Sequence, residues 1–289
     1  MSPISLTPLE LAMASVLVLA SAALSMRLAL GIQRPLLVAA ARMVVQLILV
    51  GLFLRQVFAL TSPWVTGAVV ALMIAAACHE VGSRQERRFQ GAWRYGVGGV
   101  PVGIATLGIA LLALATALRP DPWYDPRHAI PLAGIVLGTA MNSASLALNG
   151  VFTSVSRERA AIEARLALGA DRYTAFQGII RGAVRAGVLP VMNQMAAAGV
   201  ITMPGIMTGQ ILAGMDPIES AKYQILLMFL LAGGGFAASA GSVYLAVWRL
   251  TQLQPAAATG YLVGTVSRGL ALCLVRCTSV LEEPNANDA

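Results

Sequence analysis

The sequence predicts an all-α fold, a polytopic membrane helical bundle of about seven transmembrane helices. Of its 289 residues, 57% are hydrophobic and only 11% are charged, whereas soluble domains carry about 25% charged residues. Because so few charges cannot cover a soluble surface of this size, much of the surface must face lipid. The apolar residues also gather in blocks of about 20, the length that a helix needs to cross a bilayer.

The apolar blocks set the expected domain organisation. They cover residues 9–26, 36–54, 64–80, 95–118, 129–150, 191–213 and 223–248. The leader MSPISLTPLE, residues 1–10, has no basic residue and carries Glu10, so we do not interpret the first block as a signal peptide. We expect a transmembrane permease domain over residues 1–250, followed over 251–289 by a C-terminal interfacial helix and a disordered tail. An eighth span within the latter segment is the alternative.

The basic residues predict the orientation of the spans. With the N-terminus outside, 15 of the 20 basic residues fall in cytoplasmic segments and four in external loops, while Arg42 lies within a span. Since cytoplasmic loops are enriched in positive charge, we expect the N-terminus outside and the C-terminus in the cytoplasm. The net charge of +7 is spread between apolar blocks and forms no single basic face, so we expect no nucleic-acid partner.

Several classes of enzyme site are absent from the sequence. The only lysine, Lys222, does not follow the glycine loop of a phosphate-binding motif, so we expect no ATP site of that type. His79 and Glu80 begin like a zinc-protease motif, but Ser83 stands where the second histidine is required. We therefore expect a transport subunit with no catalytic residue and no cofactor of its own, and the sequence specifies no metal site.

The longest cytoplasmic stretch, residues 151–190, is expected to contain two helices joined by a turn. Helix-forming residues run from Arg157 to Leu168 and stop at Gly169, where a residue in the left-handed conformation can end a helix. A second amphipathic helix begins near Asp171, which is a suitable N-cap. An element of this kind, joined to spans on both sides, can pass motion from a soluble partner into the membrane.

This stretch resembles the coupling loop of ABC-transporter permeases, a pattern that begins Glu-Ala-Ala and has a glycine six residues after the glutamate. Glu163, Ala164 and Gly169 match the pattern, whereas Arg165 replaces its second alanine. The resemblance implies that a separate ATPase docks on this loop. The coupling residues that it implies are Glu163, Ala164, Gly169, Ala170, Asp171 and Arg172.

A longer resemblance indicates the subfamily. From Arg42-x-x-x-Gln46-Leu47 to the segment MPGIMTGQILAGMDPIESAKYQI at 203–225, the chain resembles the FetB family of permeases. That family includes bacterial proteins proposed to export iron and plant relatives linked to aluminium tolerance. The resemblance implies a homodimer in the bacterial inner membrane that works with ATPase subunits carrying ATP and Mg²⁺, and exports iron or another metal ion. The alternatives are an ABC permease for an organic solute such as a nucleotide sugar, and an ATP-independent secondary transporter.

Polar and sulfur-containing side chains within the spans mark a candidate substrate pathway. In the fifth block, polar residues recur at helical spacing along one side; in the sixth, methionines fall near one line at about 100° per residue. Pro204-Gly205 interrupts the sixth helix, and a broken helix frees backbone carbonyls for a substrate, while thioethers suit a soft metal ion. Packing between helices is the alternative interpretation of both sets. The candidates are Asn142, Ser145, Asn149, Met192, Gln194, Met195, Met203, Met207 and Gln210.

A charged residue also lies inside the second block. Arg42 and Gln46 are one helical turn apart, and Arg42 lies about 9 Å from the expected cytoplasmic edge. Its long side chain can reach toward that edge and anchor the helix. A gating or pairing role, with Glu10 or Glu80 as partner, is the alternative.

Overall fold

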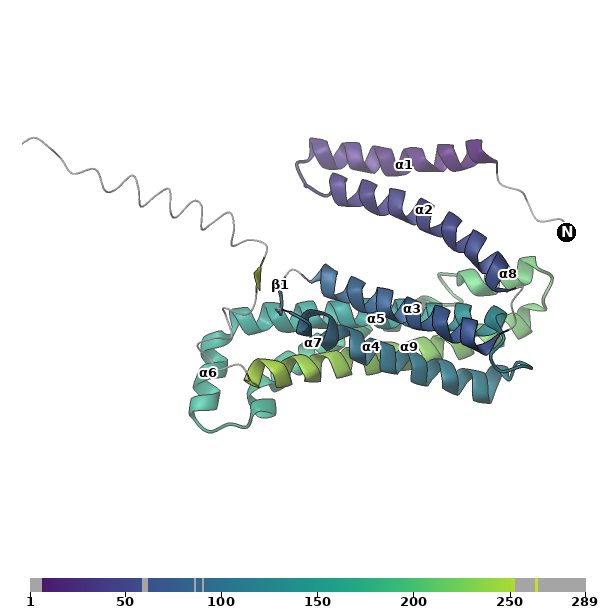
Figure 1. Ribbon diagram of the computed structural model, residues 1–289. Helices are drawn as coiled ribbons and strands as arrows, with labels where there is room; N and C mark the ends of the chain where they lie inside the picture. Colours follow the sequence, from purple (N-terminus) through teal and green to yellow (C-terminus); the bar gives the residue numbers. More distant parts are fainter. Residues whose placement is uncertain (1–6, 59–61, 86, 90, 253–262, 265–289) are drawn as a thin grey trace, which may run out of the picture. The chain divides into compact units, whose positions relative to one another are not determined.

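The computed structural model describes residues 7–58, 62–85, 87–89, 91–252 and 263–264 (Figure 1). These residues are almost entirely helical, so the predicted all-α fold is confirmed. Six of the helices within the described ranges are long and apolar enough to cross a membrane. The chain divides into two compact units, Met1–Val65 and Thr66–Ala289, which we describe separately.

The N-terminal unit is a helical hairpin. Helix α1 (Pro8–Arg27) and helix α2 (Gln33–Val57) are joined by a short turn, in which Ala29 and Gly31 have positive φ angles of 52° and 73°. The hydroxyl of Ser25 donates to Oε1 of Gln33, 3.2 Å away, beside this turn. Both helices leave most of their leucine, valine and methionine side chains exposed, as expected of surfaces that face lipid.

The second unit contains the remaining elements. Its long helices are α3 (Pro63–Arg84, whose first turn belongs to the N-terminal unit), α4 (Trp93–Ala113), α5 (Pro126–Arg157), α7 (Arg172–Ala197) and α9 (Pro217–Gln252). A π-helical turn, η1 (Leu114–Leu118), extends α4, and α6 (Arg159–Ala167) and α8 (Gly205–Leu212) are short. The two-residue strands β1 (Arg87–Arg88) and β2 (Val263–Gly264) pair antiparallel.

Glycines at the contacts between helices allow close packing and show which helices run antiparallel. A Cβ atom added to Gly98 of α4 would clash with Val81 of α3 and would lie 3.1 Å from Leu148 of α5. A Cβ at Gly241 of α9 would lie 2.9 Å from Pro101 of α4. Helix α4 runs antiparallel to α3, α5 and α9, so these last three run in the same direction (Figure 1).

Helix α7 supplies the return path between α5 and α9. Gly150 of α5 lies against Ala183 of α7, and Ser143 of α5 lies against Gly187, so the two helices are antiparallel. Because α5 and α9 run in the same direction, the chain must pass back along the bundle between them, and α7 does so. The apolar blocks predict a seventh span in this part of the chain, but α7 is not among the six helices that are long and apolar enough to cross a membrane.

The predicted block at 191–213 is wrong as a single helix. Helix α7 begins 19 residues earlier, at Arg172, and ends at Ala197; α8 follows as a separate element from Gly205. Arg181 and Arg185 make the first half of α7 polar, which explains why the apolar block begins too late. Since Gly187 packs on Ser143, the part of α7 just before 190 lies beside the fifth predicted span.

The beginning of α5 is capped by Asp125. Its Oδ1 accepts a hydrogen bond from the N–H of Arg127 at 3.2 Å, and its Oδ2 lies 2.8 Å from Nδ1 of His128. Desolvation raises the pKa of Asp125, but the hydrogen bonds and positive charges of His128 and Arg127 together lower it more, so the pKa of Asp125 lies below its ordinary value. At the other end of the chain, the predicted interfacial helix and tail fall almost wholly outside the described residues, which include only 251–252 and 263–264 of that segment.

Candidate functional site

The α6–α7 hairpin has the turn that its sequence predicts. Gly169 has a φ angle of 86°, its N–H donates to the oxygen of Leu166, and the N–H of Ala170 donates to the oxygen of Arg165. This pair of bonds is the Schellman arrangement that ends a helix at a left-handed residue. Oδ2 of Asp171 accepts from the N–H of Tyr173 at 3.1 Å, which confirms Asp171 as the N-cap of α7.

Contacts across the turn hold the hairpin as one body. Nη1 of Arg165 donates to the backbone oxygen of Ala175 at 3.2 Å. Ile162 of α6 is buried and belongs to the same apolar cluster as Phe176 and Ile179 of α7. This cluster continues into the helices of the bundle, so the hairpin is packed against the bundle at its base.

The outer face of the hairpin carries the predicted coupling residues. Glu163 forms an ion pair with Arg159, with Oε1 and Nε 2.6 Å apart, and both side chains are more than 40% exposed. Ala164, Gly169 and Arg172 are exposed as well. At the tip, Leu168 is 87% exposed. A leucine so exposed, rigidly presented beside a capped turn, suits burial in a partner.

The α3–α4 connection is anchored at the same end of the bundle. Phe89 is buried and its ring meets that of Phe152 of α5 edge to face, with centroids 5.3 Å apart. Both rings belong to the cluster that includes Ile162. The base of the hairpin, the end of α5 and the α3–α4 connection therefore share one apolar core.

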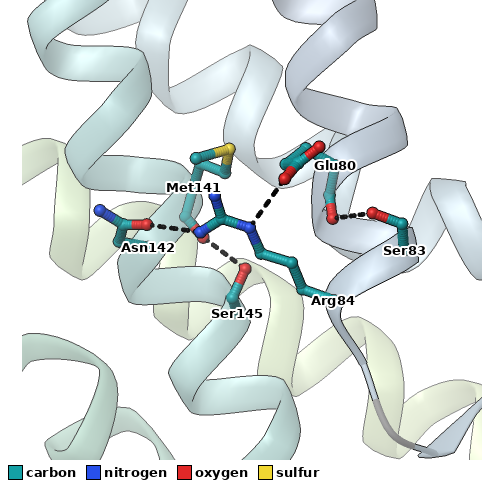
Figure 2. A network of polar contacts seen from close by, with 6 residues as sticks. All are labelled: Glu80, Ser83, Arg84, Met141, Asn142 and Ser145. Carbon is teal, nitrogen blue, oxygen red and sulfur yellow. Dashed lines mark hydrogen bonds and ion pairs between the residues drawn. The ribbon is translucent and has the colours of Figure 1, made fainter. Parts of the chain in front are cut away.

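A polar network joins α3 to α5. Figure 2 shows Glu80, Ser83 and Arg84 of α3 facing Met141, Asn142 and Ser145 of α5. Nε of Arg84 lies 3.1 Å from Oε1 of Glu80, and its Nη1 donates to Oδ1 of Asn142 at 3.0 Å. The hydroxyl of Ser145 donates to the backbone oxygen of Met141 at 2.8 Å, so its hydrogen is used within α5.

The other predicted pathway residues lie on several elements. Asn142 is exposed and Asn149 is half-buried, both on α5. The α7 candidates Met192, Gln194 and Met195 are exposed, as is Met203 in the α7–α8 connection. Met207 and Gln210 lie half-buried on α8, where Oε1 of Gln210 is buried and has no hydrogen-bond partner among the described residues.

The predicted continuous methionine line is therefore wrong. It assumes an unbroken helix over 192–210, but α7 ends at Ala197. Gly199, at a φ of 86°, donates its N–H to the oxygen of Thr202, and this turn reorients the chain before α8. The break that Pro204-Gly205 predicts is present, and Gly205 is the first residue of α8.

The intramembrane charge lies in the N-terminal unit. Arg42 and Gln46 are exposed residues of α2. Oε2 of Glu10, one of the two acids considered as a partner of Arg42, accepts the N–H of Thr7 at 2.7 Å. Within the described part of the chain, no three His, Cys, Asp or Glu side chains come together as a metal site.

Two features of the site were not predicted from the sequence. The Glu80–Arg84 ion pair could have been predicted from the sequence, because a glutamate four residues before an arginine is the favourable order for an ion pair on a helix. The hydrogen bond from Arg84 to Asn142, 58 positions later in the chain, could not have been predicted from any pattern in the sequence. The exposure of Leu168 also had no signal, since a leucine at the end of a helix is more often buried.

Comparisons with known proteins place the chain in a family. Residues 8–251 match the family described as "Uncharacterised protein family (UPF0014)". The chain is 38% identical over 200 residues to the UPF0014 membrane protein slr1647 of Synechocystis. This alignment covers 68% of this chain and 75% of that protein. No solved structure matches the chain.

Two further relatives agree with the resemblance seen in the sequence. The probable iron export permease protein FetB of Escherichia coli is 29% identical over 78% of this chain and 85% of its own length. The protein ALUMINUM SENSITIVE 3 of Arabidopsis thaliana is 28% identical over 81% of this chain and 84% of its own length. The predicted kinship with the FetB permeases and their plant relatives is thereby confirmed. The bundle of apolar helices and the match over 8–251 together make this chain a member of the UPF0014 family of membrane proteins.

Proposed function

We propose that this chain is the membrane-spanning permease subunit of an ABC transporter that exports a metal ion, iron first among the candidates. Two copies would form the pathway in the cytoplasmic membrane of a bacterium, and separate subunits would bind ATP with Mg²⁺ and hydrolyse it. The printed name of the Escherichia coli relative supports iron as the substrate. The observation that carries the proposal is the capped α6–α7 hairpin with Leu168 exposed at its tip.

The tip of the hairpin is the docking point for the ATPase in this proposal. Leu168 is 87% exposed, and burying a leucine fully stabilises a complex by about 1.5–3 kcal/mol. The neighbouring charges of Glu163 and Arg172 lie at the rim of the contact, where they favour the correct partner more than they strengthen binding. An ATPase with an apolar groove bordered by polar residues would therefore cover this surface.

Helix α7 provides the connection from the docking point to the bundle. It runs without interruption from Arg172 to Ala197, and its Gly187 packs so closely that a Cβ would lie 2.6 Å from Ser143 O and Ser239 Oγ. Such close packing does not deform gradually, so a displacement at the tip moves the helix as a body. ATP binding on the partner would then switch the bundle between inward-facing and outward-facing states.

The substrate would move along the polar and sulfur-containing residues of α5, α7 and α8. Asn142 and Asn149 offer amide oxygens on α5. The chain leaves the helical conformation between Ala197 and Gly205, and broken membrane helices can offer backbone carbonyls at substrate sites. Met192, Met195 and Gln194 lie exposed just before this turn.

Co-purification with the ATPase tests the docking surface. The chain is expressed with its ATPase, and Leu168→Ala is compared with Leu212→Ala, an exposed leucine of α8 outside the hairpin. We expect Leu168→Ala to weaken the association about tenfold or more, as loss of a buried anchor does, and Leu212→Ala to leave it unchanged. Equal association of both variants would remove the hairpin as the docking site.

Transport in inverted vesicles tests the substrate and the energy source. We expect ATP-dependent movement of Fe²⁺ into vesicles that contain both subunits, and none when the ATPase is omitted. Metal movement without the ATPase would support a secondary transporter instead. An active ATPase with no metal movement would remove iron and direct the assay to organic solutes such as nucleotide sugars.

A further inference from the structure

Two tryptophans and an arginine gather where α4 begins and α9 ends. The ring of Trp93, the first residue of α4, and the ring of Trp248 of α9 have centroids 6.1 Å apart. The guanidinium of Arg249 lies over the Trp93 ring, with Cζ 4.5 Å from the ring centroid. Its Nη1 donates to Oε1 of Gln252 at 3.2 Å. The contact between α4 and α9 therefore ends in a positive charge held on an aromatic surface.

The charge of Arg249 is not neutralised within the described part of the chain, where this residue forms no ion pair. Gln252 accepts from one of the donors of its guanidinium, and the Trp93 ring holds the group in place but leaves its charge uncompensated. The neighbouring Arg94 differs, because its Nε donates to the backbone oxygen of Gly82 at 3.1 Å and so connects α3 to α4. Arg249 therefore has both charge and donors available for an anion.

An exposed apolar stripe runs along α4 to this cluster. Val100, Ile104, Leu107 and Leu111 recur at helical spacing, and each is more than 40% exposed. Trp93, 36% exposed, lies seven residues before Val100 and therefore on the same face of α4. In a membrane protein such a stripe faces acyl chains, and tryptophan and arginine at its end lie at the level of the lipid headgroups.

We propose that Trp93, Trp248 and Arg249 bind the headgroup of an anionic phospholipid, whose acyl chains lie along the exposed stripe of α4. The guanidinium donates to the phosphate oxygens, for which its planar fork is well shaped. The indole rings pack on the glycerol and upper acyl region, where tryptophan is favoured in membranes. A zwitterionic lipid carries its own positive charge beside the phosphate, so Arg249 favours a lipid of net negative charge.

The cluster lies at the end of the bundle that carries the α6–α7 hairpin. Leu250, next to Arg249, belongs to the same apolar core as Phe89 and Ile162. A lipid bound across the ends of α4 and α9 holds these two helices together beside the base of the hairpin. Binding requires no ATPase, so the inference goes beyond the transport function proposed above and is tested apart from it.

Quenching of tryptophan fluorescence by brominated lipids tests the site directly. In the full chain the two other tryptophans, Trp64 and Trp123, are replaced by phenylalanine, so that Trp93 and Trp248 report. The protein is placed in phosphatidylcholine nanodiscs that contain increasing fractions of brominated phosphatidylglycerol or, in parallel, brominated phosphatidylcholine. We expect the apparent affinity for phosphatidylglycerol to be about fivefold higher, the contribution of one arginine at an anionic surface.

Replacing Arg249 by alanine is expected to abolish this preference. The matched control is Arg181→Ala, which removes the same charge from an exposed position of α7 and should keep the preference. If Arg249→Ala does not yield a monodisperse protein, Arg249→Gln keeps a hydrogen-bonding side chain without the charge, and it is expected to lose the preference as well.

The outcomes separate a lipid site from its alternatives. Equal quenching by the two lipids before Arg249 is changed, or a preference that survives its replacement by alanine or glutamine, would overturn the site. Loss of the preference on addition of inorganic phosphate would identify a site for free phosphate and would overturn the assignment to a lipid. Failure of the proposed function would instead appear as absent ATP-dependent transport, while the quenching results follow the expected order.

Discussion

Nη1 of Arg165 donates to the backbone oxygen of Ala175, 3.2 Å away, and so ties α6 to α7 across the turn at Gly169. Arg165 is the residue at which this chain departs from the Glu-Ala-Ala pattern of coupling loops. The departure has a structural role, because the guanidinium closes the hairpin from the α6 side. Ala175 itself is fully buried, so the bond ends in the packed base of the hairpin.

Replacing Arg165 by alanine is expected to loosen the hairpin. A hydrogen bond to a charged group contributes about 1.5–3 kcal/mol, and its loss would increase local opening without unfolding the bundle. Hydrogen exchange of the α6 amides should therefore become faster by about tenfold. Arg181→Ala, an exposed arginine further along α7, is the matched control. Equal exchange in both variants would show that the bond does not hold the hairpin.

Replacing Gly169 by alanine is expected to strain the turn. At a φ of 86° an L-residue with a Cβ costs about 1–2 kcal/mol. We expect the variant to fold, because a Cβ there meets nothing within 4 Å, but to lower ATP-driven transport severalfold by altering the presentation of Leu168. Gly178→Ala on α7 has equal space and no positive φ, so it should transport normally. The prediction fails if the two variants transport alike.

Replacing Gly187 by valine is expected to destabilise the bundle. A Cβ at this position would lie 2.6 Å from Ser143 O and from Ser239 Oγ, and 2.9 Å from Ala147 Cβ. Overpacking of this kind costs about 1–3 kcal/mol, so the melting temperature in detergent should fall by several degrees. Gly182→Ala, where nothing lies within 4 Å, should leave it nearly unchanged. A normal melting temperature in Gly187→Val would show that α5, α7 and α9 are not packed in this way.

Replacing Phe89 by alanine is expected to release the α3–α4 connection. Phe89 is buried against Phe152, and removing a buried phenylalanine costs about 3–5 kcal/mol. Trypsin should then cleave faster after Arg87 or Arg88, the residues next to it. Phe229→Ala on α9 removes an exposed ring and should not change the cleavage rate. Resistance to trypsin in both variants would contradict the anchoring role of Phe89.

Local signals explain why the hairpin was predictable from the sequence. A glycine that ends a helix and an aspartate that begins the next act through bonds to near neighbours in the chain, such as Gly169 to Leu166 and Tyr173 to Asp171. Apolar composition was likewise sufficient for the all-α fold. Both depend on physical preferences that a single segment expresses alone.

The features that were missed depend on tertiary packing. The place of α7 beside α5 results from contacts such as that of Gly187 with Ser143. The arginines of α7 lower its apolar character, so the apolar blocks did not predict where this helix begins. The methionine line failed because helical periodicity applies only to an unbroken helix, and the turn at Gly199 changes the direction of the chain before α8. The bond from Arg84 to Asn142 joins two helices whose neighbourhood no local pattern encodes.

The location of Leu168 tests the central claim most directly. A Leu168→Cys variant is made in a background in which Cys78, Cys273 and Cys277, the three natural cysteines, are replaced by serine. A membrane-impermeant maleimide should not label it in intact cells, should label it in inverted vesicles, and should label it less when the ATPase is bound. Labelling from outside intact cells, or labelling that the ATPase does not reduce, would contradict a hairpin that couples this bundle to a cytoplasmic ATPase.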